Sequence, residues 1–231
     1  MKTILKSSGQ MRTIPIDRET GKCPNPDLLR VLVACEFSGV VRDAFAKCGH
    51  DAWSVDLRPS ESAGRHFLGD ALAAIREQGP WDLLIAHPPC THLSVSGARW
   101  FPAKRADGRQ QAAIEFFMAL ARADIPAIAI ENPVCIMSSL WRKPDQIVQP
   151  WQFGEDASKA TCLWLKNLPA LTPTHYVAGR LVNRKLRWAN QTDSGQNRLG
   201  PSPTRERERS RTYPGIAAAM AAQWSNLNAT A

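Results

Sequence analysis

The sequence lacks any apolar run of the roughly 18 residues that a helix needs to cross a bilayer. Its N-terminus, MKTILKSSGQMRTIPIDRETG, has no apolar core of signal-peptide length. We therefore expect a protein of the cytoplasm that makes no contact with membranes.

Cysteine pairs at functional spacing are also lacking. The six cysteines are scattered through 231 residues, with no CxxC pair and no Cys/His cluster at zinc-ligand spacing. This pattern indicates neither a disulfide framework nor a structural metal, so we expect reduced thiols and no metal ion. A GxGxxG motif is missing as well, which disfavours a dinucleotide cofactor.

The composition is that of an ordinary folded protein, with 44% apolar and 22% charged residues. The net charge of +8 favours a polyanionic partner such as nucleic acid. Many basic proteins bind no nucleic acid, so the charge alone leaves this question open.

Short β-rich runs alternate with helical ones in the first two thirds of the chain. Strands are predicted at 30–35, 52–57, 81–87 and 127–132, and helices at 40–49, 70–79 and 109–123. This alternation predicts an α/β fold with a mostly parallel sheet and helices on both faces. Ligands of such sheets bind beyond the carboxyl ends of the strands.

The regularity weakens after Pro133. A further strand is predicted at 161–171, a polar, Arg-rich stretch follows, and an Ala-rich helix begins at Ile216. We divide the chain into an N-terminal extension (1–28), a main α/β domain (29–171), a small basic region (172–211) and a C-terminal helix that returns to the main domain (212–231).

The first two strand ends and the next helix start carry polar residues suited to a nucleoside. The turn CEFSGVVRDAF (35–45) opens into a helix whose free N–H groups would favour a polar or anionic ligand. Asp56 lies about 20 residues past this turn, where it could bind a ribose. Asp70 has two interpretations, a helix N-cap or a cofactor contact.

The remaining strand ends carry a thiol and a carboxylate. HPPC (87–90) fixes the backbone before Cys90, and ENP (131–133) presents Glu131 at the same edge of the sheet. Cys90 could be a nucleophile or an inert buried thiol, and Glu131 a catalytic group or a solvated edge charge. Both alternatives stay open for each residue taken alone.

Taken in order, EFSG, Asp56, PPC and ENP resemble the motifs of the DNA cytosine-5 methyltransferases, and among them the short members of phage and bacterial genomes. The resemblance spans about Val31 to Leu165 well and the C-terminal part loosely. It implies the Rossmann-like fold of the S-adenosylmethionine-dependent methyltransferases, S-adenosylmethionine as cofactor, and double-stranded DNA as partner of a monomer or weak dimer.

The resemblance also implies residue roles. Cys90 would be the nucleophile, Glu131 would hold the cytosine N3 edge, and Lys159 would take a catalytic arginine position. The implied cofactor-binding residues are Phe37, Ser38, Gly39, Asp56, Leu57, Asp70, Pro88 and Tyr213. Ser94 and Arg109 would contact the substrate, and we add Arg184 and Arg187 of the basic region as candidate DNA contacts.

The sequence departs from the family pattern at several motifs. ENP replaces ENV, Thr91 replaces a glutamine, and the Arg-rich catalytic segment is reduced to Ser158, Lys159 and Thr161. The turn around Tyr213 lacks the Gly-Asn pair of the last motif.

Three other functions remain alternatives. The same scaffold could transfer another one-carbon unit, such as hydroxymethyl, to cytosine, or it could be a catalytically silent DNA-binding relic. An amino-methyltransferase is disfavoured because such enzymes carry Asp, Asn or Ser before Pro-Pro and an aromatic residue after it, where this chain has HPPC.

Overall fold

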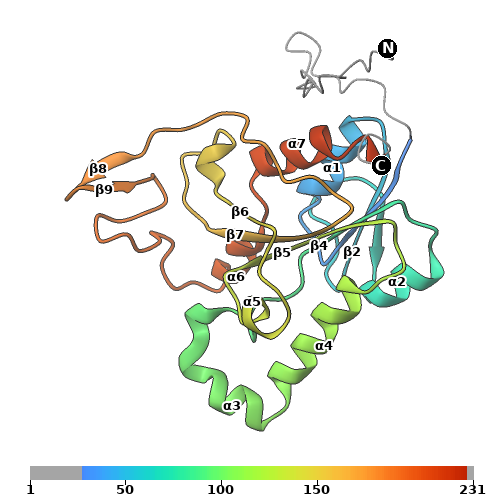
Figure 1. Cartoon of the computed structure of the whole chain (residues 1–231), viewed down its shortest axis with the longest axis horizontal. Coiled ribbons are helices and arrows are strands. Elements are labelled where there is room, and N and C mark those ends of the chain that lie inside the picture. The colour runs from blue at the N-terminus through green and yellow to red at the C-terminus, as the bar shows by residue number, and fades with distance from the viewer. Residues whose placement is uncertain (1–27, 228–231) are drawn as a thin grey trace, which may run out of the picture.

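The computed structural model describes residues 28–227 of the chain (Figure 1). The extension expected over 1–28 therefore lies outside the described residues except for Leu28. A seven-stranded sheet forms the centre of the molecule. Its strands are β1 (Arg30–Ala34), β2 (Asp51–Asp56), β3 (His66–Leu68), β4 (Leu83–Ala86), β5 (Ala127–Pro133), β6 (Gln146–Val148) and β7 (Thr161–Lys166).

The strands lie in the order β3-β2-β1-β4-β5-β7-β6. β7 runs antiparallel to both of its neighbours, and the other pairs are parallel. The predicted α/β fold with a mostly parallel sheet is confirmed. The chain reverses its direction of travel across the sheet between β1 and β4, which is where such folds bind ligands.

Helices cover both faces of the sheet, as predicted. On one face α1 (Val40–Lys47) packs beside α7 (Pro214–Gln223) (Figure 1). Their apolar residues form one core cluster with the strand residues that point to this face, including Val31 and Val33. On the other face α2 (Ala71–Glu77) and α4 (Arg109–Ala121) form a second cluster around Leu32 and Leu84. Burial on both faces explains why the central strands are continuously apolar.

Several elements were not expected from the sequence. These are the strands β3 and β6, the short helices η1 (Val95–Trp100), α3 (Phe101–Ala106), α5 (Met137–Leu140), η2 (Pro150–Gln152) and α6 (Arg205–Ser210), and a separate hairpin of β8 (Arg180–Val182) and β9 (Lys185–Arg187). Asn183 and Arg184 have φ values of 48° and 61°, which defines a two-residue turn that suits the twist of a hairpin.

Two element boundaries and one cysteine differ from expectation. The strand predicted at 161–171 ends at Lys166, because Asn167 has a φ of 53° and a proline follows at 169. The last helix begins at Pro214, a good first helical residue, rather than at Ile216. Cys48 is disulfide-bonded. The expectation that the cysteines are reduced is therefore wrong for Cys48, and the sequence contains no CxxC spacing that would indicate this bond.

Within residues 28–227, no helix is both long enough and apolar enough to span a bilayer.

Candidate active site

The parallel pairing of β4 with β5 brings the HPPC and ENP motifs together. Their last register pair is Ala86 with Ile130, so His87 and Glu131 come next at the same edge. His87 Nδ1 lies 2.8 Å from Glu131 Oε2. One residue further on, the Asn132 amide donates a 2.7 Å hydrogen bond to the carbonyl oxygen of Pro88. The two motifs thus form one hydrogen-bonded unit.

Cys90 lies at the end of this unit with a partly exposed side chain. Its carbonyl oxygen accepts hydrogen bonds from the backbone N–H groups of Leu93 and Ser94, at 3.0 and 2.9 Å, which fixes a turn directly after the thiol. Burial raises the pKa of the Cys90 thiol above its ordinary value, against the lowering effect of Lys159. The thiol is therefore mainly protonated near neutral pH.

Glu131 is a buried carboxylate with three partners. Burial alone would raise its pKa, but the charge of Lys159 and the hydrogen bond and charge of His87 outweigh burial and lower the pKa to about 2. The hydroxyl of Thr212 also points to Glu131 Oε2, at 3.4 Å. Glu131 is therefore an ionised group in a water-poor environment, and not a solvated edge charge.

Lys159 carries the cation of this cluster. Its charge acts on Cys90, His87 and Glu131. Its ammonium group donates to the carbonyl oxygens of Arg209 and Arg211, at 3.0 and 3.4 Å. These two bonds fix the ammonium group beside the chain that leads to Thr212.

The turn after β1 is built around Glu36, which sequence reasoning missed. Its buried carboxylate accepts hydrogen bonds from the backbone N–H groups of Val41, at 2.7 Å, and Arg42, at 3.1 Å. The expectation that the N–H groups at the start of this helix are free to face a ligand is therefore wrong for these two residues. Phe37 and Ser38 are nearly buried, and Gly39 has a φ of 74°, which glycine adopts without strain.

Asp56 and Asp70 lie near one another, around Cys35. After burial, their two charges are what raises the pKa of the Cys35 thiol to about 12. Asp56 accepts a 2.9 Å hydrogen bond from the backbone N–H of Arg58. Asp70 is the N-cap of α2 and accepts from the N–H of Ala73 at 2.8 Å. The N-cap interpretation of Asp70 therefore holds, and a cofactor contact for it stays a prediction.

The other predicted cofactor residues differ in surroundings. Leu57 is 79% exposed. Pro88 is buried and held by Asn132. Tyr213 is half-buried at the N-cap of α7, and burial raises the pKa of its phenol, which bonds to Asn190.

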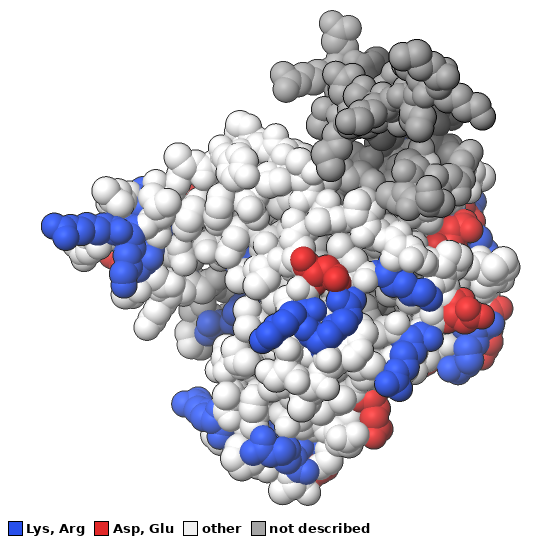
Figure 2. Space-filling model, in the orientation of Figure 1, with Lys and Arg blue, Asp and Glu red and all other residues white. Residues whose placement is uncertain are grey.

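The predicted substrate contacts are spread over three regions. Ser94 is the N-cap of η1, and its hydroxyl lies 2.9 Å from that of Ser96. Arg109 begins α4 and pairs with Asp107. Arg184 is exposed at the turn of the β8–β9 hairpin, which projects from the body of the molecule (Figures 1 and 2). The guanidinium of Arg187 donates to the carbonyl oxygens of Asp193 and Leu186, at 3.2 and 3.0 Å, and so helps to shape the loop after the hairpin.

Four residues of the site were missed from the sequence: Glu36, His87, Asn132 and Thr212. His87 carried a usable signal, because a polar residue directly after a buried strand lies at the ligand-binding edge. Thr212 gave none, since nothing local indicates that a residue 81 positions away from Glu131 will meet it.

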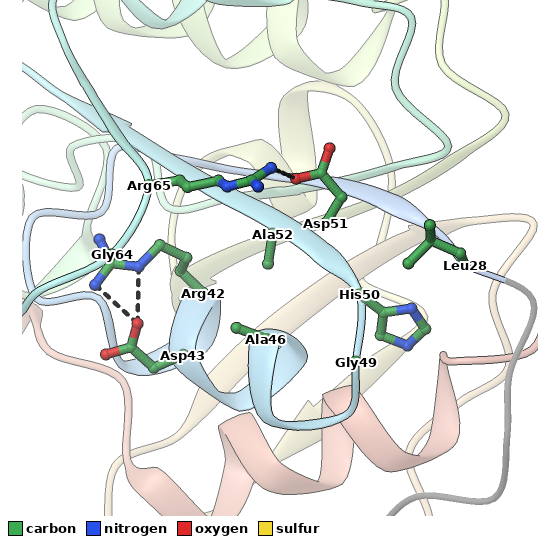
Figure 3. Close-up of a pocket in the computed structure, with 10 residues that line it drawn as sticks. All are labelled: Leu28, Arg42, Asp43, Ala46, Gly49, His50, Asp51, Ala52, Gly64 and Arg65. Carbon is green, nitrogen blue, oxygen red and sulfur yellow. Dashed lines mark hydrogen bonds and ion pairs between the residues drawn. The ribbon is translucent and has the colours of Figure 1, made fainter.

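An open pocket lies elsewhere. It has a volume of about 540 Å³ and is lined by residues from the end of α1, the start of β2 and the chain before β3, including Ala46, His50, Asp51 and Arg65 (Figure 3). Asp51 begins β2, so this pocket belongs to the edge of the sheet opposite Cys90 and Glu131.

Fold and site together define an α/β protein with a thiol and an ion-paired carboxylate at the carboxyl ends of the neighbouring strands β4 and β5. No protein-family model matches the sequence, and no curated protein matches it. One similar solved structure, from E. coli, is described as a candidate DNA modification methyltransferase encoded within a prophage. It is 16% identical, with a TM-score of 0.45 over 64% of this chain and 52% of that chain. This chain thus spans about half the length of that structure, and so distant a likeness carries no argument about function.

Proposed function

We propose that the protein is a DNA cytosine-5 methyltransferase that uses Cys90 as nucleophile and S-adenosylmethionine as methyl donor. The observation that carries this proposal is that hydrogen bonds join the HPPC motif to the ENP motif. This contact supports the proposal that Cys90 and Glu131 act on the same cytosine base. A structural cysteine would need no ionised carboxylate and no lysine beside it.

The cofactor-side residues fit the chemistry of S-adenosylmethionine. Its ribose hydroxyls and adenine amino group are hydrogen-bond donors, and Asp56 and Asp70 offer carboxylate acceptors that lie near one another. Phe37 and Ser38 would hold the methionine part and Leu57 the adenine face. When bound, S-adenosylmethionine supplies an electrophilic methyl group.

The chain's own residues address the weak nucleophilicity of cytosine C5. The Cys90 thiolate adds to C6, and Glu131 stabilises the protonated N3, so that C5 becomes an enamine-like carbon able to take a methyl group. After transfer, loss of the C5 proton to a base and cleavage of the S–C6 bond release the thiol. Lys159 favours the thiolate through its charge.

Such a reaction requires the base to leave the duplex, at a cost of about a few kcal/mol. Contacts to the phosphates and to the extruded base would offset this cost. Exposed arginines of the β8–β9 hairpin and of the region around α3, among them Arg184, Arg99 and Arg105, are suited to phosphate contacts. Figure 2 shows Lys and Arg gathered at both places.

The test uses labelled S-adenosylmethionine and duplex DNA that contains 5-fluorocytosine, from which the C5 substituent cannot leave. We expect a covalent protein–DNA adduct that maps to Cys90 and disappears in Cys90→Ala. The matched control is Cys162→Ala, which removes a buried thiol from β7 and should leave the adduct intact.

The alternatives give different results in the same experiment. Mass spectrometry of the modified base separates methyl from hydroxymethyl transfer, and a silent relic forms no adduct. Label on the cytosine amino group that persists in Cys90→Ala would indicate an amino-methyltransferase and exclude the thiol mechanism.

A further inference from the structure

The proposed function leaves His87 unused, although it is in closest contact with Glu131. His87 follows β4 directly and is fixed opposite Glu131 by the strand register. Its Nδ1 lies 2.8 Å from Glu131 Oε2, and the two side chains are only 10% and 8% exposed. A hydrogen bond between a buried imidazole and a buried carboxylate is a strong and geometrically defined interaction.

The charges around His87 come from three elements. Glu131 in β5 and Glu36 in the turn after β1 both favour the imidazolium, whereas burial and Lys159, which precedes β7, oppose it. Burial lowers the pKa of His87, but the hydrogen bond to Glu131 and the two carboxylate charges outweigh it, and the pKa is raised. The raised pKa of His87 and the lowered pKa of Glu131 place the proton that the two groups share on His87 rather than on Glu131.

This arrangement raises a chemical problem for the proposed reaction. When the Cys90 thiolate adds to C6, N3 of the cytosine becomes basic and needs a proton. Glu131 has a pKa of about 2 in this environment, so it carries no proton of its own to give. The proton must reach N3 through Glu131 from a neighbouring acid.

We propose that His87 is the proton reservoir of this site and acts through Glu131. As the S–C6 bond forms, the Nδ1 proton of His87 passes to Oε2 of Glu131, and Glu131 passes a proton from its carboxyl group to cytosine N3. When the S–C6 bond breaks, N3 returns its proton through Glu131 to His87. No further reactant is needed. His87 does not touch the base and is a positioning residue in this scheme.

The second nitrogen of His87 supports a functional role. Within residues 28–227, His87 Nε2 is buried and has no hydrogen-bond partner. A histidine retained only for stability would be expected to satisfy both ring nitrogens, because a buried polar atom without a partner destabilises the fold. Each such atom needs an explanation, and a catalytic role is one that fits His87 beside Glu131.

The experiment measures single-turnover methylation of DNA against pH for the wild type and His87→Asn. Asparagine can place an N–H where Nδ1 lies, so it keeps the hydrogen bond to Glu131 but cannot release a proton. The wild-type rate should pass through a maximum with pH, because it needs the Cys90 thiolate, which forms as pH rises, and protonated His87, which is lost as pH rises. In His87→Asn we expect a rate lower by about 10²-fold, unchanged DNA affinity, and no fall at high pH.

The outcomes separate this inference from the proposed function. If the wild type forms no adduct at Cys90 with 5-fluorocytosine DNA, both fail. If it forms the adduct but His87→Asn keeps the wild-type rate and the same fall at high pH, the proton reservoir is excluded and the methyltransferase proposal stands.

A second measurement covers the case in which His87→Asn does not fold. An NMR titration of the histidine side chains of the wild-type protein should show one imidazole whose pKa lies above the ordinary value of about 6.5 and falls in Glu131→Gln. If every histidine becomes neutral at or below the ordinary value, the proposal is overturned.

Discussion

Two opposing effects act on the ionisation of Cys90: burial disfavours its thiolate, and nearby cations favour it. Burial is the largest influence and raises the pKa of the thiol, Glu131 adds to this effect, and Lys159 and Arg209 act in the opposite direction. The thiol is therefore not activated in advance. Ionisation of Cys90 depends on the balance between burial, which raises its pKa, and the charge of Lys159, which lowers it. Two carbonyl oxygens hold the ammonium group of Lys159 in place.

Replacing Lys159 with glutamine should raise the pKa of Cys90 further, because the largest lowering influence is lost. Alkylation of Cys90 by iodoacetamide, followed against pH by peptide mass spectrometry, should have a midpoint at higher pH. At a fixed pH below the midpoint, the alkylation rate should fall roughly tenfold for each pH unit by which the midpoint rises. The control is Lys166→Gln, whose ammonium group binds the Ile125 carbonyl instead. An unchanged or lower midpoint in Lys159→Gln would contradict the assignment.

The sequence predicted the pair Cys90 and Glu131 because each residue follows a strongly apolar strand. It did not predict the contacts that determine how they ionise. The bond from His87 to Glu131 depends on the register of β4 against β5, and the contact of Thr212 depends on how the last segment returns to the sheet. Local patterns contain neither piece of information.

At the scale of elements, the strongly apolar or patterned segments were predicted, and the segments without such a pattern were not. β1, β2, β4, β5, α1, α2 and α4 have the apolar periodicity of buried elements. β3 and β6 are three-residue strands without a buried apolar run, and α6 is RERERS, which has no apolar residue to show a helical period. Pairing with β2 and β7, respectively, stabilises β3 and β6, and this is a tertiary effect that propensity does not show.

The β8–β9 hairpin is the element best suited to bind the phosphates of the DNA backbone. Arg184 and Lys185 are exposed at its turn. The double variant Arg184→Asn/Lys185→Gln should weaken DNA binding at low salt, because asparagine tolerates the φ of 61° at position 184 and the turn should be kept. Each lost phosphate contact reduces the slope of log affinity against log salt by about 0.9.

Fluorescence anisotropy over a range of salt concentrations measures this slope. The matched control is Lys47→Gln/Arg76→Gln, which removes the same charge from exposed positions in α1 and α2. Equal slopes for the two double variants would show that the hairpin makes no specific phosphate contacts.

At the scale of the whole molecule, the segment 205–213 joins the two halves of the candidate site. Arg207 and Arg211 form ion pairs with Glu61 in the chain after β2, on the side of the proposed cofactor. Thr212 reaches Glu131 on the reacting side. Glu61 also contacts the turn after β1, where proposed cofactor-binding residues lie. Its backbone N–H donates a 2.8 Å hydrogen bond to the carbonyl oxygen of Phe37. Binding of the proposed cofactor should therefore affect the mobility of segment 205–213.

Limited trypsin digestion tests this link, because the segment presents four arginines, three of them in the exposed helix α6. Ligand that binds only the folded form lowers the population of opened states by the factor 1 + [L]/Kd. Saturating S-adenosylhomocysteine should thus slow cleavage within 205–211 by at least tenfold. In Glu61→Gln, where the ion pairs to Arg207 and Arg211 are lost, cleavage should be faster and the protection weaker. Glu77→Gln, an exposed change on α2, should behave as the wild type. If calorimetry shows that the ligand binds while cleavage in this segment is unaffected, the segment does not communicate with the cofactor side.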